Sequence, residues 1–252
     1  MHMTTIRRAG AVLLTAASLG ACAQDAAPAH PSARRAFALP PSADLSYDLS
    51  ARQRGFSLKG DALVTWRAAD GKYQLKAESR VAVLGTLTED RSEGAIDAYG
   101  LAPAEFWEKR LRKDPTTTTF DRAAKTLRFS ESEQTYPLKG GEQDRVSVTW
   151  QLAAVARAAG DKLKPGASLG FFVAGRRDAE AWTFKVAKRE KLRTGLGELD
   201  TVLLVREPLA DGRNQTLSVW LAPERDWYPV KLRFTDGDKE TIEQTIRAID
   251  KQ

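Results

Sequence analysis

Cysteine and histidine, which many enzymes use as nucleophile, base or metal ligand, occur only near the start of this 252-residue chain. They are Cys22, His2 and His30, and the only methionines are Met1 and Met3. From residue 31 onward the chain therefore lacks the thiol and imidazole of Cys-His and Ser-His-Asp catalysis. The same stretch has no Cys or His to bind zinc, copper, haem or an iron–sulfur cluster. We expect no metal site and no cofactor.

Carboxylate chemistry remains open, because a glycosidase needs only two acidic side chains. Close acidic pairs occur at Glu89/Asp90 and at Glu131/Glu133. However, 33 Asp and Glu residues make such pairs inevitable by composition. The sequence also lacks the glycine-rich phosphate-binding motifs and the Gly-x-Ser-x-Gly and Ser-x-x-Lys nucleophile motifs. We predict that the protein is not an enzyme and has no catalytic residue; a carboxylate-dependent hydrolase acting on an envelope polymer is the alternative.

Residues 1–21 have the layout of a secretory signal peptide. Arg7 and Arg8 form a positive start, and an uncharged apolar run follows from Ala9 to Ala17. This run is shorter than the roughly 20 residues that a membrane-spanning helix needs. The protein is therefore predicted to be exported to the periplasm.

The end of this leader allows two kinds of processing. Residues 19–22, Leu-Gly-Ala-Cys, resemble the lipobox of bacterial lipoproteins, so Cys22 is the predicted lipidation site. By resemblance to lipoprotein sorting rules, Ala23 in place of Asp favours the outer membrane, with membrane contact through the lipid anchor only. Ala21-Cys22-Ala23 also fits ordinary signal peptidase, which would release a soluble periplasmic protein. Residues 22–42 are rich in Ala and Pro and are predicted to be a tether.

Residues 43–252 are predicted to form a single β-rich domain, because apolar and polar residues alternate in several segments. Two alternating segments, 56–66 and 73–83, flank an Asp-Gly pair at 70–71, which is a strong hairpin signal. The pattern recurs at residues 182–186, 217–221 and 230–234, with further Asp-Gly turns at 211–212 and 236–237.

One helix is predicted among the strands. Its apolar stripe consists of Val148, Leu152, Val155 and Ala159. Asp144 is the predicted N-terminal cap, and Gly160 is the predicted end of the helix. Residues 104–112 fit either a short helix or a strand. The resulting fold class is mainly β: a curved antiparallel sheet, a half-barrel or β-clam, with one α-helix covering its concave face.

The apolar side chains of this half-barrel allow either core packing or a ligand groove. Trp66 and Trp182 fall on the apolar parity of their segments, which favours core packing. The functional alternative is a groove for an acyl chain or a sugar, lined by Trp66, Trp182, Phe184 and Leu152.

The polar parities carry many Lys and Arg residues, and the chain has a formal charge of +6. In the cell envelope, such a surface favours lipid headgroups, lipopolysaccharide phosphates or acidic glycans as partners. A solvated face that keeps the protein in solution is the simpler interpretation. Nucleic acid is not expected as a partner of an exported protein.

Several short motifs resemble the bacterial exported family known as domain of unknown function 3108. They are Gln143-Asp144-Arg145-Val146-Ser147 before the helix, Trp220-Leu221-Ala222-Pro223, Pro229-Val230-Lys231-Leu232-Arg233-Phe234, Asp236-Gly237, and Gly60-Asp61-Ala62 with Trp66. The family has no established reaction, so the resemblance implies no catalytic residues. A more distant similarity links the fold to envelope β-clam proteins, including lipoprotein-localisation carriers and capsule-associated lipoproteins, and implies an apolar cavity.

Taken together, these features predict a non-catalytic module of the cell envelope, anchored as a lipoprotein. Its expected ligand is a lipid or glycan, lipopolysaccharide included, or its partner is another envelope protein. A soluble periplasmic protein and a carboxylate-dependent hydrolase remain the alternatives.

Overall fold

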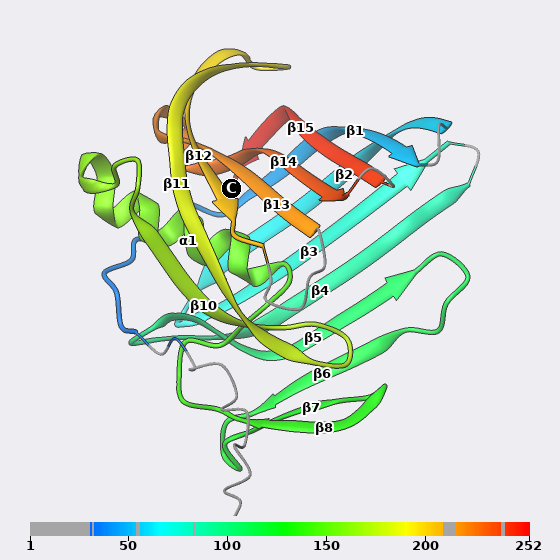
Figure 1. The fold of residues 1–252 in the computed structure, drawn as a ribbon, viewed down its shortest axis with the longest axis vertical. Helices are drawn as coiled ribbons and strands as arrows, with labels where there is room; N and C mark the ends of the chain where they lie inside the picture. The colour runs from blue at the N-terminus through cyan, green and yellow to red at the C-terminus, as the bar shows by residue number, and fades with distance from the viewer. Residues whose placement is uncertain (1–30, 32, 54–55, 83, 209–214, 238–239) are drawn as a thin grey trace, which may run out of the picture.

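The computed structural model describes residues 31, 33–53, 56–82, 84–208, 215–237 and 240–252. This part of the chain forms one large curved antiparallel sheet and one α-helix (Figure 1). The mainly β fold class is therefore confirmed. The predicted leader, Cys22 and the turn at 211–212 lie outside the described residues.

The strands before the helix are β1 (Ala43–Gln53), β2 (Phe56–Ala69), β3 (Lys72–Val81), β4 (Gly85–Asp97), β5 (Gly100–Arg110), β6 (Thr116–Asp121), β7 (Thr126–Phe129), β8 (Ser132–Pro137) and β9 (Gln143–Asp144). The helical segments are α1 (Ser147–Ala159) and two short 3-10 turns, η1 (Gly160–Lys162) and η2 (Pro223–Arg225). The strands after the helix are β10 (Ser168–Ala174), β11 (Ala179–Thr194), β12 (Gly197–Arg206), β13 (Gln215–Ala222), β14 (Tyr228–Asp236) and β15 (Glu240–Lys251).

The sheet has the order β8-β7-β6-β5-β4-β3-β2-β1-β15-β14-β13-β12-β11-β10-β9. The first and last strands of the domain, β1 and β15, pair at its middle, and the parallel pair β9–β10 lies at one edge. The long bent strands β11 and β12 curl over α1, which lies between them and strands β1 to β5 (Figure 1). The sheet therefore wraps around its own helix.

The hairpin predicted at residues 70–71 is confirmed. Ala69 pairs with Lys72 across the turn, and Asp70 and Gly71 adopt φ values of 51° and 71°. Two consecutive positive φ angles define the tight turn whose twist matches antiparallel strands, and the Asp-Gly sequence favours them. The segment that fitted either a helix or a strand lies mostly in β5.

Helix α1 is buried on more sides than its sequence predicts. Residues 147–156 are all buried, whereas the periodicity indicates a single apolar stripe. The additional cover comes partly from residues 37–42. The amide of Ala38 donates to the carbonyl of Ala154 at 2.9 Å, and Arg157 donates to the carbonyl of Leu39 at 3.0 Å. The last residues of the predicted tether therefore pack against the helix, while residues 22–30 lie outside the described part.

The core between helix and sheet contains a stacked pair of indoles. Trp66 on β2 and Trp150 on α1 have ring centroids 4.6 Å apart and ring planes inclined by 18°. Trp66 is fully buried, and its indole N–H donates to the carbonyl of Pro40 at 3.1 Å. One side chain thus connects the sheet, the helix and the amino-terminal segment.

We expect Trp66→Ala to lower the free energy of unfolding by about 3–5 kcal/mol, because it leaves a large void and removes the ring stacking. Urea unfolding followed by circular dichroism measures the change. The matched control is Phe56→Ala at a position that is 77% exposed, where a change within about 0.5 kcal/mol is expected. Equal effects of the two substitutions would contradict the core role of Trp66.

Candidate functional site: a cavity with an apolar and a charged wall

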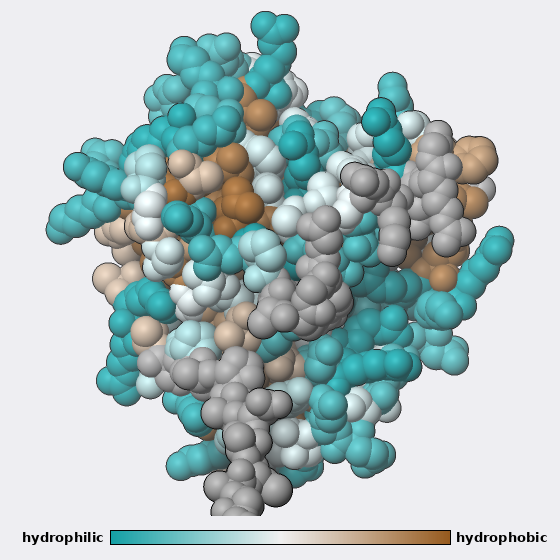
Figure 2. Space-filling model, viewed as in Figure 1, coloured by the Kyte–Doolittle hydropathy of each residue, from teal (hydrophilic) through white to brown (hydrophobic). Residues whose placement is uncertain are grey.

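A cavity of about 570 Å³ lies on the concave side of the sheet. This volume is within the range of about 300–1,000 Å³ that is typical of small-molecule sites. Its apolar wall consists of Leu49, Ala51, Val64, Leu75, Ala77, Leu217, Leu232, Phe234 and Ile242. The surface in Figure 2 is mostly hydrophilic, with apolar residues gathered over strands β11 to β13.

One charged part of the cavity wall is formed by Asp90 on β4, Glu108 and Arg110 on β5, and Arg145 between β9 and α1, which we call the charged wall. Four more charged residues line the cavity elsewhere: Glu180, Arg206, Asp236 and Glu240. Strand register explains how the two walls meet. Val64 pairs with Ala77, Ala77 with Asp90, and Asp90 with Glu108. Side chains paired in this way project from the same face of a sheet, so one row runs from apolar to acidic residues.

The carboxyl group of Asp90 is only partly satisfied by polar partners in the charged wall. Its Oδ1 atom is buried and accepts no hydrogen bond within the described residues. Burial raises the pKa of Asp90 to about 7, and the neighbouring Glu108 adds to this effect. A carboxyl with this pKa changes between a hydrogen-bond donor and an anion near neutral pH.

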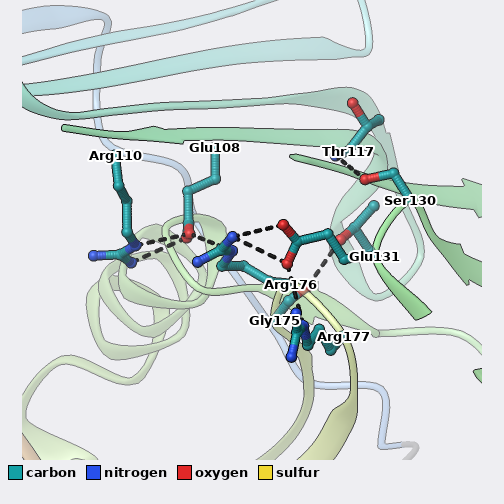
Figure 3. Close-up of polar contacts among 9 residues, drawn as sticks. Glu108, Arg110, Thr117, Ser130, Glu131, Gly175, Arg176 and Arg177 are labelled. Carbon is teal, nitrogen blue, oxygen red and sulfur yellow. Dashed lines mark hydrogen bonds and ion pairs between the residues drawn. The ribbon is translucent and has the colours of Figure 1, made fainter. Parts of the chain in front are cut away.

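Glu108 belongs instead to a chain of ion pairs, which we call the clasp: Glu108, Arg110, Arg176, Glu131 and Arg177 (Figure 3). Glu108 is only 2% exposed and lies 2.9 Å from Arg110 and 3.3 Å from Arg176. Arg176 also contacts Glu131 at 2.8 Å, and Arg177 contacts it at 3.2 Å. The clasp therefore joins β5, the β7–β8 turn and the β10–β11 turn.

The acidic pairs noticed in the sequence do not act together. Glu89 points away from the cavity and pairs with Lys76 and Arg91, whereas Asp90 points into it. Glu131 belongs to the clasp and Glu133 is exposed. Register instead places Asp90 opposite Glu108 on the neighbouring strand, and both residues line the cavity.

The four predicted groove residues lie in two different environments. Trp182 is in the cavity wall, where its indole N–H donates to Glu180 at 3.0 Å and Arg206 lies 4.4 Å from its ring centroid. Trp66, Phe184 and Leu152 are fully buried in the core, outside the cavity lining. Alternation identifies the inward face, but it does not distinguish a packed position from a wall position.

Arg145 and Asp90 were not among the predicted site residues. Two features of the sequence could have identified them. On β4, the alternate positions that point inward carry the polar residues Thr88, Asp90 and Ser92, and Arg145 lies within a motif that resembles the family. Within the described residues, no group of three or more His, Cys, Asp or Glu side chains is arranged to hold a metal ion. No helix in this part of the chain is long and apolar enough to span a membrane.

Comparison with known proteins gives a family and a number of distant structural neighbours, two of which follow. The profile of the family "Protein of unknown function (DUF3108)" matches residues 46–246. A domain from Vibrio parahaemolyticus, described as an outer membrane lipoprotein-sorting protein, has a TM-score of 0.32 and 11% identity, covering 84% of this chain and 86% of that one. A DUF1329 family protein from Desulfovibrio piger ATCC 29098 has a TM-score of 0.29 and 8% identity, with the same coverage. A search of curated proteins found no match.

The two glutamates of the clasp, Glu108 and Glu131, should contribute unequally to the free energy of unfolding. We expect Glu108→Gln to lower the free energy of unfolding by about 2–4 kcal/mol, because it removes a buried charge between two arginines. Glu131→Gln is the matched control, with a clearly smaller expected loss, since its ion pairs are more exposed to solvent. Urea unfolding of both variants at pH 7 measures the difference. A larger loss for Glu131→Gln would contradict the central role of Glu108.

Proposed function

The chain belongs to the DUF3108 family, and we propose that it is a non-catalytic binding module of the cell envelope that holds an amphipathic ligand in its cavity. The observation that carries the proposal is the composition of the cavity. The cavity is lined by apolar side chains on one part of its wall and by charged groups on another, which suits a ligand with an apolar body and a polar end. A lipid, a lipopolysaccharide or another envelope protein presenting an acyl chain fits this description.

A second candidate function rests on Asp90 and Glu108. They are cross-strand neighbours in the cavity, and their environments differ: burial raises the pKa of Asp90, whereas arginines surround Glu108. Two carboxyl groups in different environments are the minimum equipment of a hydrolase. The binding proposal is favoured because Glu108 is engaged by two arginines of the clasp, which restrains it from acting on a substrate. Hydrolysis of an envelope glycan by the purified protein, lost in Asp90→Asn, would favour the hydrolase.

We further propose that the protein is exported and lipidated at Cys22, which would place it in the periplasm and tether it to the outer membrane. The supporting features are the charged and apolar segments of residues 1–21 and the Leu-Gly-Ala-Cys sequence that follows. Because residues 37–42 pack on α1, the spacer between anchor and domain would be the segment before them. Without lipidation, the protein would be soluble in the periplasm.

Filling the cavity should weaken the binding of an apolar probe. The probe is N-phenyl-1-naphthylamine, whose fluorescence rises in apolar surroundings. We expect Ala77→Phe to weaken its binding at least fivefold, because the new ring occupies the space between the two walls. Ala95→Phe is the matched control on the exposed side of β4, and its affinity should equal that of the unmodified protein. Equal binding by the two variants would refute the cavity as the binding site.

Replacing Cys22 with Ser tests the anchor. We expect the variant to lose the incorporation of radioactive palmitate and to move from the membrane fraction to the soluble periplasmic fraction. Fractionation and autoradiography of cells that express each form provide the measurement. Unchanged membrane association and labelling would refute lipidation at this residue, while the cavity proposal would be unaffected.

A further inference from the structure

Arg145 is a charged side chain of the cavity wall that has no direct partner in the described part of the chain. It is half-buried, and within the described residues it forms no hydrogen bond and no ion pair. Other arginines near the cavity are engaged: Arg110 pairs with Glu108, and Arg206 donates to the carbonyl of Gln215 at 2.6 Å. The guanidinium of Arg145 therefore keeps its donors for a ligand.

The fold leaves space for this guanidinium. A Cβ atom on Gly175, in the turn between β10 and β11, would lie 2.6 Å from Nη2 and 2.8 Å from Nε of Arg145. Any larger residue at position 175 would collide with the guanidinium. The backbone on either side of Arg145 is fixed as well, because the amide of Val146 donates to Asp144 at 3.0 Å. The backbone beside Arg145 is therefore fixed, and the lack of a side chain on Gly175 leaves room for the guanidinium at the wall.

Asp90 adds a second polar group with unused hydrogen-bonding capacity to the same wall. The charged groups that act on it are Glu108 and Arg110 from β5, and Asp144 and Arg145 from the segment before α1; its neighbour on β3 is Ala77. Burial favours its neutral form, and the pKa of about 7 means that this form prevails below neutral pH. A neutral Asp90 can donate a hydrogen bond to an anion.

We infer that Arg145 and Asp90 form the head-group end of the cavity, and that the ligand is an amphiphile with an apolar chain and an anionic head. This inference rests on the proposed function. An anionic group would supply the counter-charge that Arg145 lacks and would form the strong, charge-assisted hydrogen bonds that guanidinium groups make with carboxylates and phosphates. The chain would lie along the apolar wall. A cationic head would instead face Arg145 unfavourably.

The test compares ligands that share one chain and differ in the head. Decanesulfonate, 1-decanol and methanesulfonate are each tested at pH 6 for their ability to displace N-phenyl-1-naphthylamine from the full-length protein. We expect decanesulfonate to bind about tenfold more tightly than decanol, and methanesulfonate not to compete. Equal binding of decanesulfonate and decanol would overturn the inference and leave the proposed function standing. If neither displaces the probe, the proposed function fails as well.

Variants of Arg145 assign the preference to this residue. Arg145→Gln should lower decanesulfonate affinity about tenfold and leave decanol affinity unchanged, whereas Arg145→Lys should retain much of the preference. Arg91→Gln, on the exposed side of β4, is the control for a general loss of positive charge. If Arg91→Gln lowers decanesulfonate affinity as much as Arg145→Gln does, the inference is overturned. Decanol binding shows that each variant is folded.

The pH dependence of decanesulfonate affinity tests the role of Asp90, because a purely structural role of this residue would not produce it. Decanesulfonate keeps its charge between pH 6 and pH 8, so any change in affinity comes from the protein. We expect binding to weaken about three- to tenfold over this interval, because Asp90 loses its proton and then repels the anion. Asp90→Asn should remove the pH dependence and bind more tightly than the unmodified protein at pH 8. A pH dependence that persists in Asp90→Asn would overturn the role of Asp90.

The anionic head could belong to a fatty acid or to a phosphate-bearing lipid. Decanoate and decyl phosphate, compared at pH 6, distinguish these sources by their relative affinity. Tight binding of either, lost in Arg145→Gln, supports the assignment. Tight binding of inorganic phosphate without any chain would overturn it, since the site would then recognise a free anion.

Discussion

The buried carboxylate of Asp144 is the contact on which the arrangement of helix, sheet and cavity depends. It accepts hydrogen bonds from the amide of Val146, the N-cap residue of α1, at 3.0 Å and from the amide of Ser147, the first helical residue, at 2.8 Å. The prediction of Asp144 as the N-cap was wrong by two residues, although its side chain binds the start of the helix. The carboxylate also accepts a hydrogen bond from the hydroxyl of Ser92 at 2.5 Å, which in turn contacts the hydroxyl of Tyr73. Burial raises the pKa of Asp144, and these hydrogen bonds oppose the shift. The same contacts direct the next residue, Arg145, to the cavity.

Two further contacts hold the sheet around the helix. The side-chain amide of Gln151 accepts from the amide of Leu101 and donates to the carbonyl of Tyr99, each at 2.8 Å, so α1 is attached to the start of β5. Gly100 lies between these residues with a φ of 105°, and a Cβ there would approach the Gln151 side chain to 2.4 Å. The clasp provides the second attachment, at the other end of β5. The cavity lies where neither contact fills the space.

The cavity combines its two walls through strand register, so its chemistry follows from pairing between strands. The apolar wall comes largely from β1, β2, β3, β14 and β15, and the charged wall from β4, β5 and the segment before α1. With no thiol or imidazole from residue 31 onward, the polar side chains that line the cavity are carboxyl, guanidinium, hydroxyl and amide groups. These groups suit the reversible binding of an amphiphile, with Arg145 and Asp90 as the polar contacts.

The sequence by itself determined the local features. Alternation predicted a mainly β domain, the Asp-Gly pair at 70–71 predicted a hairpin, and Gly160 marked the end of the helix. These features depend on neighbouring residues, whose spacing is visible in the chain. Only the tertiary structure decided that Asp90 lies beside Glu108, that Trp182 reaches the cavity while Trp66 is packed in the core, and that residues 37–42 cover α1. Alternation reveals the face to which a side chain points, whereas register and curvature, set by contacts between distant segments, determine what it meets there.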